Sequence, residues 1–397
     1  MQIVKFIAYL FCYLFYPLSF LVPRSKRILV FGSQNGAFND NAKYLFIYAN
    51  TYLKEQYRSI WISPQRATAT HIQQLGYEAY WVASPKGFWY ALRGKYWFVN
   101  SYTSDILFCL AGNATVVNLW HGLPWKCIEF GIKKGTLAKR YSRQDKLDVF
   151  FHPACFRRPD FVASGGQMIT EIFVYSFRID MSQCIPSGYP RNYLLTCNNN
   201  QVFDFIRQYE SPYTLDLANK IQSYQTTYIY MPTWRDSQRN LFAKGIDLDA
   251  LNEAMKEQNA LMIMKPHPNT QTPKNIQYSN LIFMNSTADV YCILPLTDVL
   301  ITDYSSVMFD YPLMENKSMI LYQYDYNEYI AEREFNFPLE SNIIGRKVVS
   351  FDELIEVIKN KEYTLNSKER AVFLDKFWGE TMKMDSCKEI LERVCKA

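Results

Sequence analysis

Two of the four histidines in this sequence follow short apolar segments that we predict to be strands. His121 stands in Asn118-Leu-Trp-His-Gly-Leu-Pro124, and His267 stands between Pro266 and Pro268. The two prolines prevent the chain from continuing as a strand or helix, so we expect His267 on a rigid turn. Because an imidazole takes up a proton near neutral pH, both histidines are candidates for acid–base chemistry. The alternative for either residue taken alone is a structural histidine.

A cluster of hydroxyl groups, Thr302-Asp-Tyr-Ser-Ser306, follows the apolar run 299–301. This cluster stands where a buried strand should give way to a helix. The first N–H groups of a helix lack partners inside it, so a bound phosphate can accept from them while Thr302, Ser305 and Ser306 donate alongside. The alternative is an ordinary helix cap, in which Asp303 or Ser305 serves only the helix.

Cationic side chains follow other predicted strands of the chain. Arg235 lies in the polar segment after the apolar run 226–231, Lys265 comes directly after the run 261–264, and Arg191 lies in the hinge region of the sequence. With the hydroxyl cluster they would gather the positive charge and hydrogen-bond donors that a diphosphate requires. The alternative for each cation alone is a solvated surface charge.

Strand-like and helix-like segments alternate along both halves of the chain. The candidate residues named above are positioned by these segments. A polar passage, residues 195–211, separates the halves, and we expect little structure in it. Alternation of this kind predicts parallel sheets with helices on both faces and ligands at the carboxyl ends of the strands. We therefore predict an α/β protein of two doubly wound, Rossmann-type halves that face each other across a cleft.

The predicted segments have these bounds. Strands are expected at 28–31, 59–63, 77–83, 96–100, 115–119, 226–231, 261–264, 299–301 and 318–322, and helices at 42–55, 352–359, 367–376 and 386–394. The predicted domains are an apolar segment at 1–26, an acceptor domain at 27–205 and a donor-binding domain at 206–397 that includes the closing helices.

Composition excludes several classes of protein. A chain of 397 residues with 49% hydrophobic and 20% charged residues is expected to fold, and a net charge of +5 does not suggest a nucleic-acid partner. The nine cysteines show neither a disulfide framework nor a zinc-ligand spacing, which favours a reducing compartment. We predict no protein-bound metal site from the spacing of these residues.

Residues 6–22 are almost wholly apolar and are followed by Arg24, Lys26 and Arg27. The run is short for a membrane span, and Pro17 would break or kink it, so we predict an interfacial membrane-associating segment with a basic border. The alternatives are a secretory signal, which the position of the basic cluster argues against, and a hydrophobic helix packed on the protein's own surface.

Several motifs resemble, in order, those of the CDP-glycerol glycerophosphotransferase family, the teichoic acid primases and polymerases. The resemblance covers nearly everything from Arg27 to the C-terminus, and includes the opening stretch 28–48 with Asp40-Asn41. The motifs are Trp120-His-Gly-Leu-Pro124, Gly188-Tyr-Pro-Arg-Asn192, Pro232-Thr-Trp-Arg-Asp236, Lys265-Pro-His-Pro268 and Thr302-Asp-Tyr-Ser-Ser306. One departure is Tyr193, which stands where the family pattern usually has an acid.

The resemblance implies a GT-B fold, peripheral attachment to the cytoplasmic face of the cell membrane, and transfer of an alditol phosphate from a CDP-linked donor with release of CMP. It implies that His121 activates the acceptor hydroxyl and that His267 contacts the donor phosphates or assists the leaving CMP. Residues implied in substrate binding are Arg191, Arg235, Asp236, Lys265, Thr302, Asp303, Ser305 and Ser306. Positioning and electrostatics would then supply most of the catalysis.

The expected reaction is therefore transfer of glycerol phosphate or ribitol phosphate to a hydroxyl of a lipid-linked, capsular or teichoic-acid-type glycan. Two alternatives stay open: a GT-B glycosyltransferase that uses a nucleotide sugar, and a membrane-associated nucleotide-binding or scaffold protein. No cofactor is certain. A divalent cation is possible, although Asp298, Asp303 and Asp310 have no strict ligand spacing.

Overall fold

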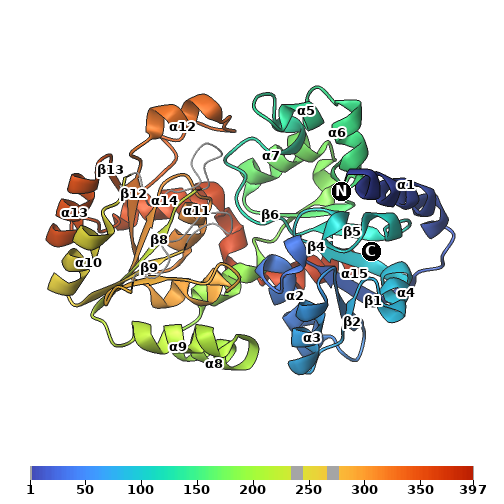
Figure 1. Cartoon of the computed structure of the whole chain (residues 1–397), viewed down its shortest axis with the longest axis horizontal. Helices are drawn as coiled ribbons and strands as arrows, with labels where there is room; N and C mark the ends of the chain where they lie inside the picture. The colour runs from blue at the N-terminus through green and yellow to red at the C-terminus, as the bar shows by residue number, and fades with distance from the viewer. Residues whose placement is uncertain (1, 234–244, 266–276, 397) are drawn as a thin grey trace. The chain divides into compact units, whose positions relative to one another are not determined.

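The computed structural model describes residues 2–233, 245–265 and 277–396, with side chains from residue 6 onward. Two parallel β-sheets flanked by helices make up the fold (Figure 1). The first sheet has the order β3-β2-β1-β4-β5-β6-β7. Its strands are β1 (Ser25–Gly32), β2 (Arg58–Ser63), β3 (Ala79–Trp81), β4 (Gly94–Val99), β5 (Thr115–Asn118), β6 (Phe161–Ser164) and β7 (Cys184–Pro186).

Strand β1 occupies the point where the strand order of the first sheet reverses. Leu29, Val30 and Phe31 in its middle are fully buried, because helices cover both faces of the sheet. Leu29 and Phe31 face a core built with α2 (Asp40–Tyr52), α3 (Arg66–Gln74) and α15 (Ser386–Cys395), whereas Val30 faces a core built with α4 (Pro85–Arg93). The remaining helices beside this sheet are α1 (Gln2–Ser19), α5 (Ala138–Tyr141), α6 (Lys146–Phe151) and α7 (Gln167–Phe177).

The second sheet has the order β10-β9-β8-β11-β12-β13, and all its pairings are parallel. Its strands are β8 (Thr226–Met231), β9 (Ala260–Met264), β10 (Leu281–Phe283), β11 (Val299–Thr302), β12 (Ser318–Tyr322) and β13 (Arg346–Val348). The order reverses between β8 and β11. The helices in this part are α8 (Asn199–Tyr209), α9 (Pro212–Ile221), α10 (Leu248–Glu257), α11 (Val307–Asp310), α12 (Tyr326–Glu332), α13 (Phe351–Asn360) and α14 (Ser367–Phe377).

Each sheet organises its own compact unit. The first unit comprises residues 1–193, 334–336 and 377–397, and the second comprises 194–333 and 337–376. The last helix, α15, thus returns to the first unit, because its apolar face packs in the core that α2 and β1 share. The sequence had placed all residues after 205 in the second domain. The arrangement of the two units across a cleft stays a prediction.

The predicted strands and closing helices are present, and the differences have local causes. Residues 195–211 are not the unstructured passage that we expected, because α8 lies within them. An Asn198–Gln201 capping box starts this helix, and its apolar face buries Val202 and Ile206. Strands β6, β7, β10 and β13, each three or four residues long, were not predicted.

Helix α1 contains most of the predicted apolar segment. Pro17 lies in its last turn, and the helix ends at Ser19, so the apolar run 6–22 is not helical throughout. Among the residues described above, no helix is both long enough and apolar enough to cross a bilayer. All nine cysteines are free thiols.

Candidate functional site

The segment that carries His121 leaves the first sheet at the end of β5 and is held by two side chains from distant parts of the chain. The amide Nδ2 of Asn41, in the first turn of α2, donates to the carbonyl oxygens of Leu119 and Trp120 at 3.2 and 2.9 Å. The Nη1 atom of Arg191 donates to the carbonyl oxygen of His121 at 3.0 Å. Three consecutive carbonyl groups are therefore fixed, which places the imidazole on a rigid support.

Unusual backbone angles accompany this arrangement. Trp120 has φ 53° and Asp40 has φ 58°, in the left-handed region that non-glycine residues avoid. Conformations of this kind cost about 1–3 kcal/mol each and persist where the surroundings determine them, often at functional sites. Gly122, with φ 153°, occupies a conformation that an L side chain rarely adopts. Trp120 and Gly122 directly flank His121, whereas Asp40 lies at the start of α2.

The imidazole of His121 has a defined tautomer. Its Nδ1 lies 3.1 Å from the backbone oxygen of Asn100, which follows β4. A carbonyl oxygen can only accept, so Nδ1 carries the proton and Nε2 keeps a lone pair. Burial lowers the pKa of His121 below its ordinary value, while Asp40 and the Asn100 hydrogen bond act in the opposite direction. A neutral imidazole with a free Nε2 is suited to act as a general base.

Arg191, which we predicted to bind substrate, is only 2% exposed and pairs with a carboxylate. Its Nη1 lies 2.8 Å from Oδ1 of Asp40, and its backbone N–H donates to Oδ1 of Asn41. The sequence analysis did not identify Asn41, Asn100 or Asp40, the partner of Arg191, as site residues. Asp40-Asn41 was noticed only as part of a family resemblance, and its contact with Arg191 could not be read from spacing along the chain.

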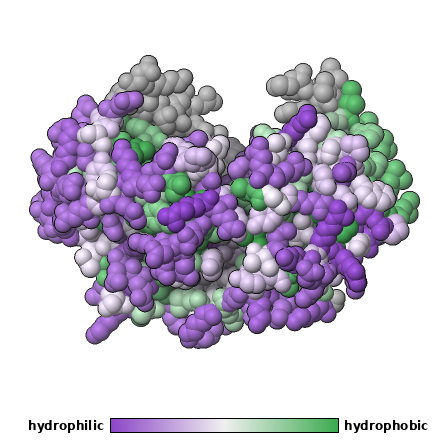
Figure 2. All heavy atoms as spheres, turned by 90° about the horizontal axis from the view of Figure 1, so that it is seen from below, coloured by the Kyte–Doolittle hydropathy of each residue, from purple (hydrophilic) through white to green (hydrophobic). Residues whose placement is uncertain are grey.

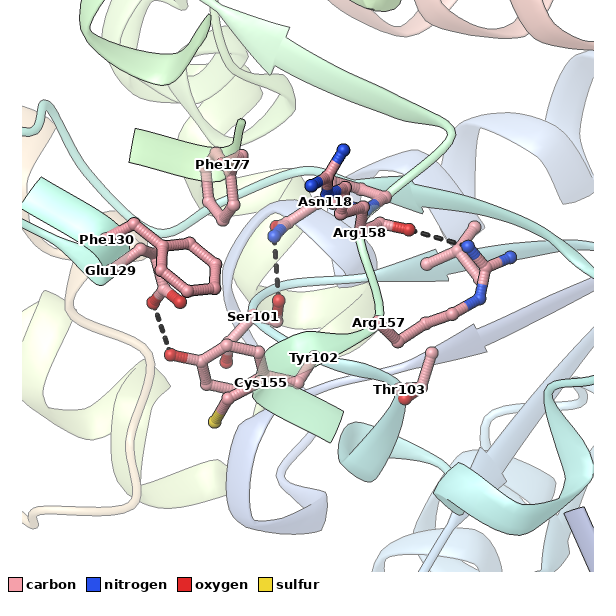
Figure 3. A pocket seen from close by; sticks show the side chains of 12 residues that line it. Ser101, Tyr102, Thr103, Asn118, Glu129, Phe130, Cys155, Arg157, Arg158 and Phe177 are labelled. Carbon is pink, nitrogen blue, oxygen red and sulfur yellow. Dashed lines mark hydrogen bonds between the residues drawn. The ribbon is translucent and has the colours of Figure 1, made fainter. Parts of the chain in front are cut away.

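A small cavity lies in the first unit among residues from β5, the segment after β4 and the segment that continues from His121 (Figure 3). The carboxylate of Glu129 accepts from the hydroxyl of Tyr102, which lies 2.8 Å from the hydroxyl of Tyr141. Burial raises the pKa of Glu129 to about 7, although hydrogen bonds from the two tyrosines oppose the shift. The amide of Asn118 donates to the carbonyl oxygen of Ser101 on another wall.

In the second unit, the predicted hydroxyl cluster follows β11 at the point where the strand order reverses. Ligands of doubly wound sheets bind outside the carboxyl ends of strands at such a point. The hydroxyl of Thr302 donates to the carbonyl oxygen of Met231 at 2.7 Å, and Oδ1 of Asp303 accepts from the N–H of Thr233 at 2.9 Å. Both side chains are fully buried and tie β11 to the end of β8. Their predicted contact with a diphosphate stays a prediction.

Ser305 and Ser306 are half-buried, whereas their neighbours Thr302, Asp303 and Tyr304 are fully buried. The helix that they precede, α11, is only four residues long. The side chain of Lys265 donates to the carbonyl oxygens of Asn285, Ser286 and Ala288. Burial lowers the pKa of Lys265 to about 8, with Asp289 acting in the opposite direction.

The acids near the hydroxyl cluster have protein partners. Oδ2 of Asp298 accepts from the N–H of Thr227, and Asp310 accepts from the hydroxyl of Tyr291. Within the described residues, the one group of side chains close enough to share a metal ion comprises Glu210, Asp289 and Cys292. Cys292 already donates to Glu210 at 3.1 Å. A divalent cation therefore stays an untested possibility.

Three predicted site residues, Arg235, Asp236 and His267, lie outside the described residues. The described part thus contains His121 and Arg191 in the first unit, and Lys265, Thr302, Asp303, Ser305 and Ser306 in the second.

Comparison with known proteins supplies independent information. The family described as CDP-Glycerol:Poly(glycerophosphate) glycerophosphotransferase matches residues 14–396. A teichoic acid glycerol-phosphate transferase of Staphylococcus aureus is 27% identical over 366 residues, 89% of each chain. A teichoic acid poly(ribitol-phosphate) polymerase of Bacillus spizizenii is 29% identical over 278 residues, which cover 68% of this chain and 42% of the polymerase. The structure of the wall teichoic acid polymerase TagF has the same fold, with a TM-score of 0.75 at 22% identity over 99% of this chain and 98% of that chain.

Proposed function

This chain belongs to the CDP-glycerol:poly(glycerophosphate) glycerophosphotransferase family, and we propose that His121 is the base that activates the acceptor hydroxyl in its reaction. As a member of this family, the chain is a phosphotransferase that moves an alditol phosphate from a CDP-linked donor. The observation that carries the role of His121 is its geometry. With Nδ1–H directed at the Asn100 carbonyl, only Nε2 can accept a proton from a substrate.

The proposed step is an in-line displacement at phosphorus. Nε2 of His121 removes the proton of the acceptor hydroxyl, and the oxygen attacks the phosphorus that carries the alditol. The bond from that phosphorus to the bridging oxygen breaks, and CMP leaves with the electron pair. Because this kind of transition state needs little covalent help from the protein, positioning of the base and stabilisation of charge supply most of the rate.

For the donor, we propose that Ser305 and Ser306 hydrogen-bond the diphosphate of the CDP compound. Two observations support this proposal. The serines follow β11 at the point where the strand order reverses, and they are partly exposed beside the buried, hydrogen-bonded Thr302. In this proposal, Lys265, Thr302 and Asp303 hold the loops around the diphosphate through their hydrogen bonds, and Lys265 and Asp303 also contribute their charges. Arg235, Asp236 and His267 keep their predicted roles toward the donor phosphates, and Arg191 its predicted role in substrate binding.

We also propose that the two units form a GT-B arrangement and that the acceptor is a lipid-linked, teichoic-acid-type or capsular glycan. Two all-parallel sheets with reversal points support the first proposal. The names of the relatives, which are teichoic acid transferases and polymerases of glycerol and ribitol phosphate, support the second. The family match favours phosphotransfer over the alternative of a nucleotide-sugar glycosyltransferase.

A peripheral position at the cytoplasmic face of the membrane is proposed on the basis of α1. One face of this helix packs on the first unit through aromatic pairs, with Tyr13–Phe150 centroids 5.2 Å apart and Tyr16–Phe108 centroids 4.4 Å apart. The opposite face exposes apolar side chains at helical spacing, and Figure 2 shows hydrophobic residues at the right-hand edge, where α1 lies. They are Ile7, Leu10, Phe11, Leu14 and Leu18.

Exposed groups beside α1 extend this surface. Trp89 on α4 is 55% exposed and lies under the guanidinium of Arg93, while Leu147 on α6 is 65% exposed. Lys26 and Arg27 follow the apolar segment and are exposed. An amphipathic helix with a tryptophan and cations at its border is suited to lie in the interface of an anionic membrane.

The experiment that tests the proposed reaction uses the full chain, membrane extract as acceptor, and CDP-glycerol or CDP-ribitol as donor. Acceptor-dependent release of CMP and a product whose mass increases by one or more alditol phosphate units are expected. A glycosidic product from a nucleotide sugar, or binding of the CDP compounds without turnover, would contradict the proposal.

A further inference from the structure

The charged environment of His121 is built from two elements that meet from distant parts of the first unit. Asp40 begins α2, and Arg191 lies in the segment that follows β7. The third neighbour, Asn100, contributes a neutral carbonyl group. Lys43, the cation in the first turn of α2, has its ammonium over the rings of Phe38 and Tyr44. Among the described residues, Asp40 and Arg191 are thus the charged groups that act on the imidazole.

One atom connects these groups. Nη1 of Arg191 donates both to Oδ1 of Asp40, at 2.8 Å, and to the carbonyl oxygen of His121, at 3.0 Å. The same Oδ1 accepts from the backbone N–H of Asn41, which fixes the carboxylate at the start of α2. The position of the His121 backbone therefore depends on an ion pair whose arginine is almost completely buried.

We propose that the Asp40–Arg191 ion pair is a positioning device for His121, which holds its backbone carbonyl while balancing the charge beside its imidazole. This inference rests on the proposed role of His121 as a base. A guanidinium alone would fix the carbonyl equally well but would disfavour protonation of the imidazole, and transfer of the substrate proton to Nε2 requires that protonation. The carboxylate of Asp40 offsets this effect, so neither partner can be lost without consequence.

The two partners act on the imidazole in opposite directions. Burial is the largest influence and lowers the pKa of His121; Asp40 raises it and Arg191 lowers it. Removal of one charge leaves the other uncompensated in a largely buried place. A pair with a purely structural role would affect His121 in the same direction whichever partner was changed. The opposite signs therefore distinguish a charge-balancing pair from a structural one.

The test is a pH titration of the His121 ring by NMR, which the small number of histidines makes tractable. Asp40→Asn keeps an oxygen that can accept from Arg191 and Asn41, and we expect it to lower the pKa of His121 by about half a unit or more. Arg191→Gln is expected to raise this pKa by a similar amount. The double variant should return toward the wild-type value, and His121→Asn assigns the signal.

Glu78→Gln is the matched control, because the Glu78–Arg58 ion pair lies in the same unit and is partly exposed. It should leave the His121 titration unchanged. Arg191→Lys keeps the charge and is expected to move the pKa less than Arg191→Gln does. If Arg191→Gln does not fold, Asp40→Asn and Arg191→Lys still give the test. Equal pKa values in Asp40→Asn and the wild type, or shifts of the same sign in the two charge-removing variants, would overturn the proposal.

The pH dependence of kcat/KM on its acidic side, here called the acid limb, is measured on the same variants. It separates a failure of the positioning proposal from a failure of the proposal that His121 is the base. If the limb moves with the NMR pKa, both are supported. If the NMR pKa shifts as expected while the limb stays fixed, the ion pair tunes an imidazole that is not the base. If the limb moves but the NMR pKa does not, the positioning proposal fails.

Discussion

The Nδ1 atom of His121 lies 3.1 Å from the backbone oxygen of Asn100, and this contact decides which ring nitrogen faces a substrate. Since burial lowers the pKa of the ring, His121 is neutral at pH 7. We expect kcat/KM to rise with pH through a pKa below the ordinary value of about 6.5 and to be flat near neutrality. A pH–rate profile from about pH 4.5 to about pH 8 measures this rise in kcat/KM and its pKa. A limb above the ordinary histidine value would contradict the assigned environment.

Loss of the two serine hydroxyls should weaken donor binding. Hydrogen bonds to charged groups are worth about 1.5–3 kcal/mol each, so Ser305→Ala combined with Ser306→Ala should weaken CDP binding by about tenfold or more. Isothermal titration calorimetry with CDP measures this effect, and Ser223→Ala, at an exposed position in the same unit, is the control. Equal affinities of the double variant and the wild type would show that the diphosphate lies elsewhere.

The buried carboxyl of Glu129 should make stability depend on pH. Its pKa is raised to about 7, so between the ordinary value and pH 7 the folded state holds a proton that the unfolded chain has released. The contribution of Glu129 to the free energy of unfolding is therefore fully present at low pH and is lost as the pH rises toward 7. Over this pH range, the free energy of unfolding that Glu129 contributes falls by roughly 3 kcal/mol.

Glu129→Gln removes this titration and keeps a side chain that can hydrogen-bond Tyr102. Free energies of unfolding from urea titrations at several pH values should show the wild type losing stability relative to the variant as pH rises. Asp105, whose pKa burial also raises to about 7, is common to both proteins and cancels in the difference. A difference that is independent of pH would mean that Glu129 titrates normally.

The exposed face of α1 should bind anionic membranes. Phe11→Ser combined with Leu14→Gln removes two side chains that are 63% and 68% exposed and leaves the packed face of the helix unchanged. Co-flotation with vesicles containing phosphatidylglycerol should fall at least about fivefold, since apolar burial drives such binding. Val372→Gln, at a 70% exposed position on α14, is the control and should float as the wild type does. Unchanged flotation of the α1 variant would exclude this face as the membrane contact.

The fold could be predicted from sequence because its main strands are continuous apolar runs with polar clusters at their ends. The runs that became β1, β8 and β11 are buried on both faces, and this burial requires the residue types that mark them. Helix α8 was missed because its asparagine-rich start is typical of a loop, although Asn198 caps the helix.

The supports of the site could be predicted only in part. His121 stands out by its residue type and its place after a predicted strand, and Arg191 stands out as a cation in the hinge region of the sequence. The contacts that hold them join residues well separated along the chain, from 21 positions for His121 with Asn100 to 151 positions for Arg191 with Asp40. Spacing along the chain does not determine such contacts, because they depend on the order of strands in the sheet.

The role of His121 as the base is tested by CMP release from His121→Gln, measured with saturating CDP-alditol donor and a membrane acceptor. We expect a loss of about a hundredfold or more in kcat, with donor binding and thermal stability close to those of the wild type. His152→Gln, at a half-exposed position in the same unit, is the control and should retain activity. An unchanged kcat in His121→Gln would contradict the central claim that this imidazole activates the acceptor hydroxyl.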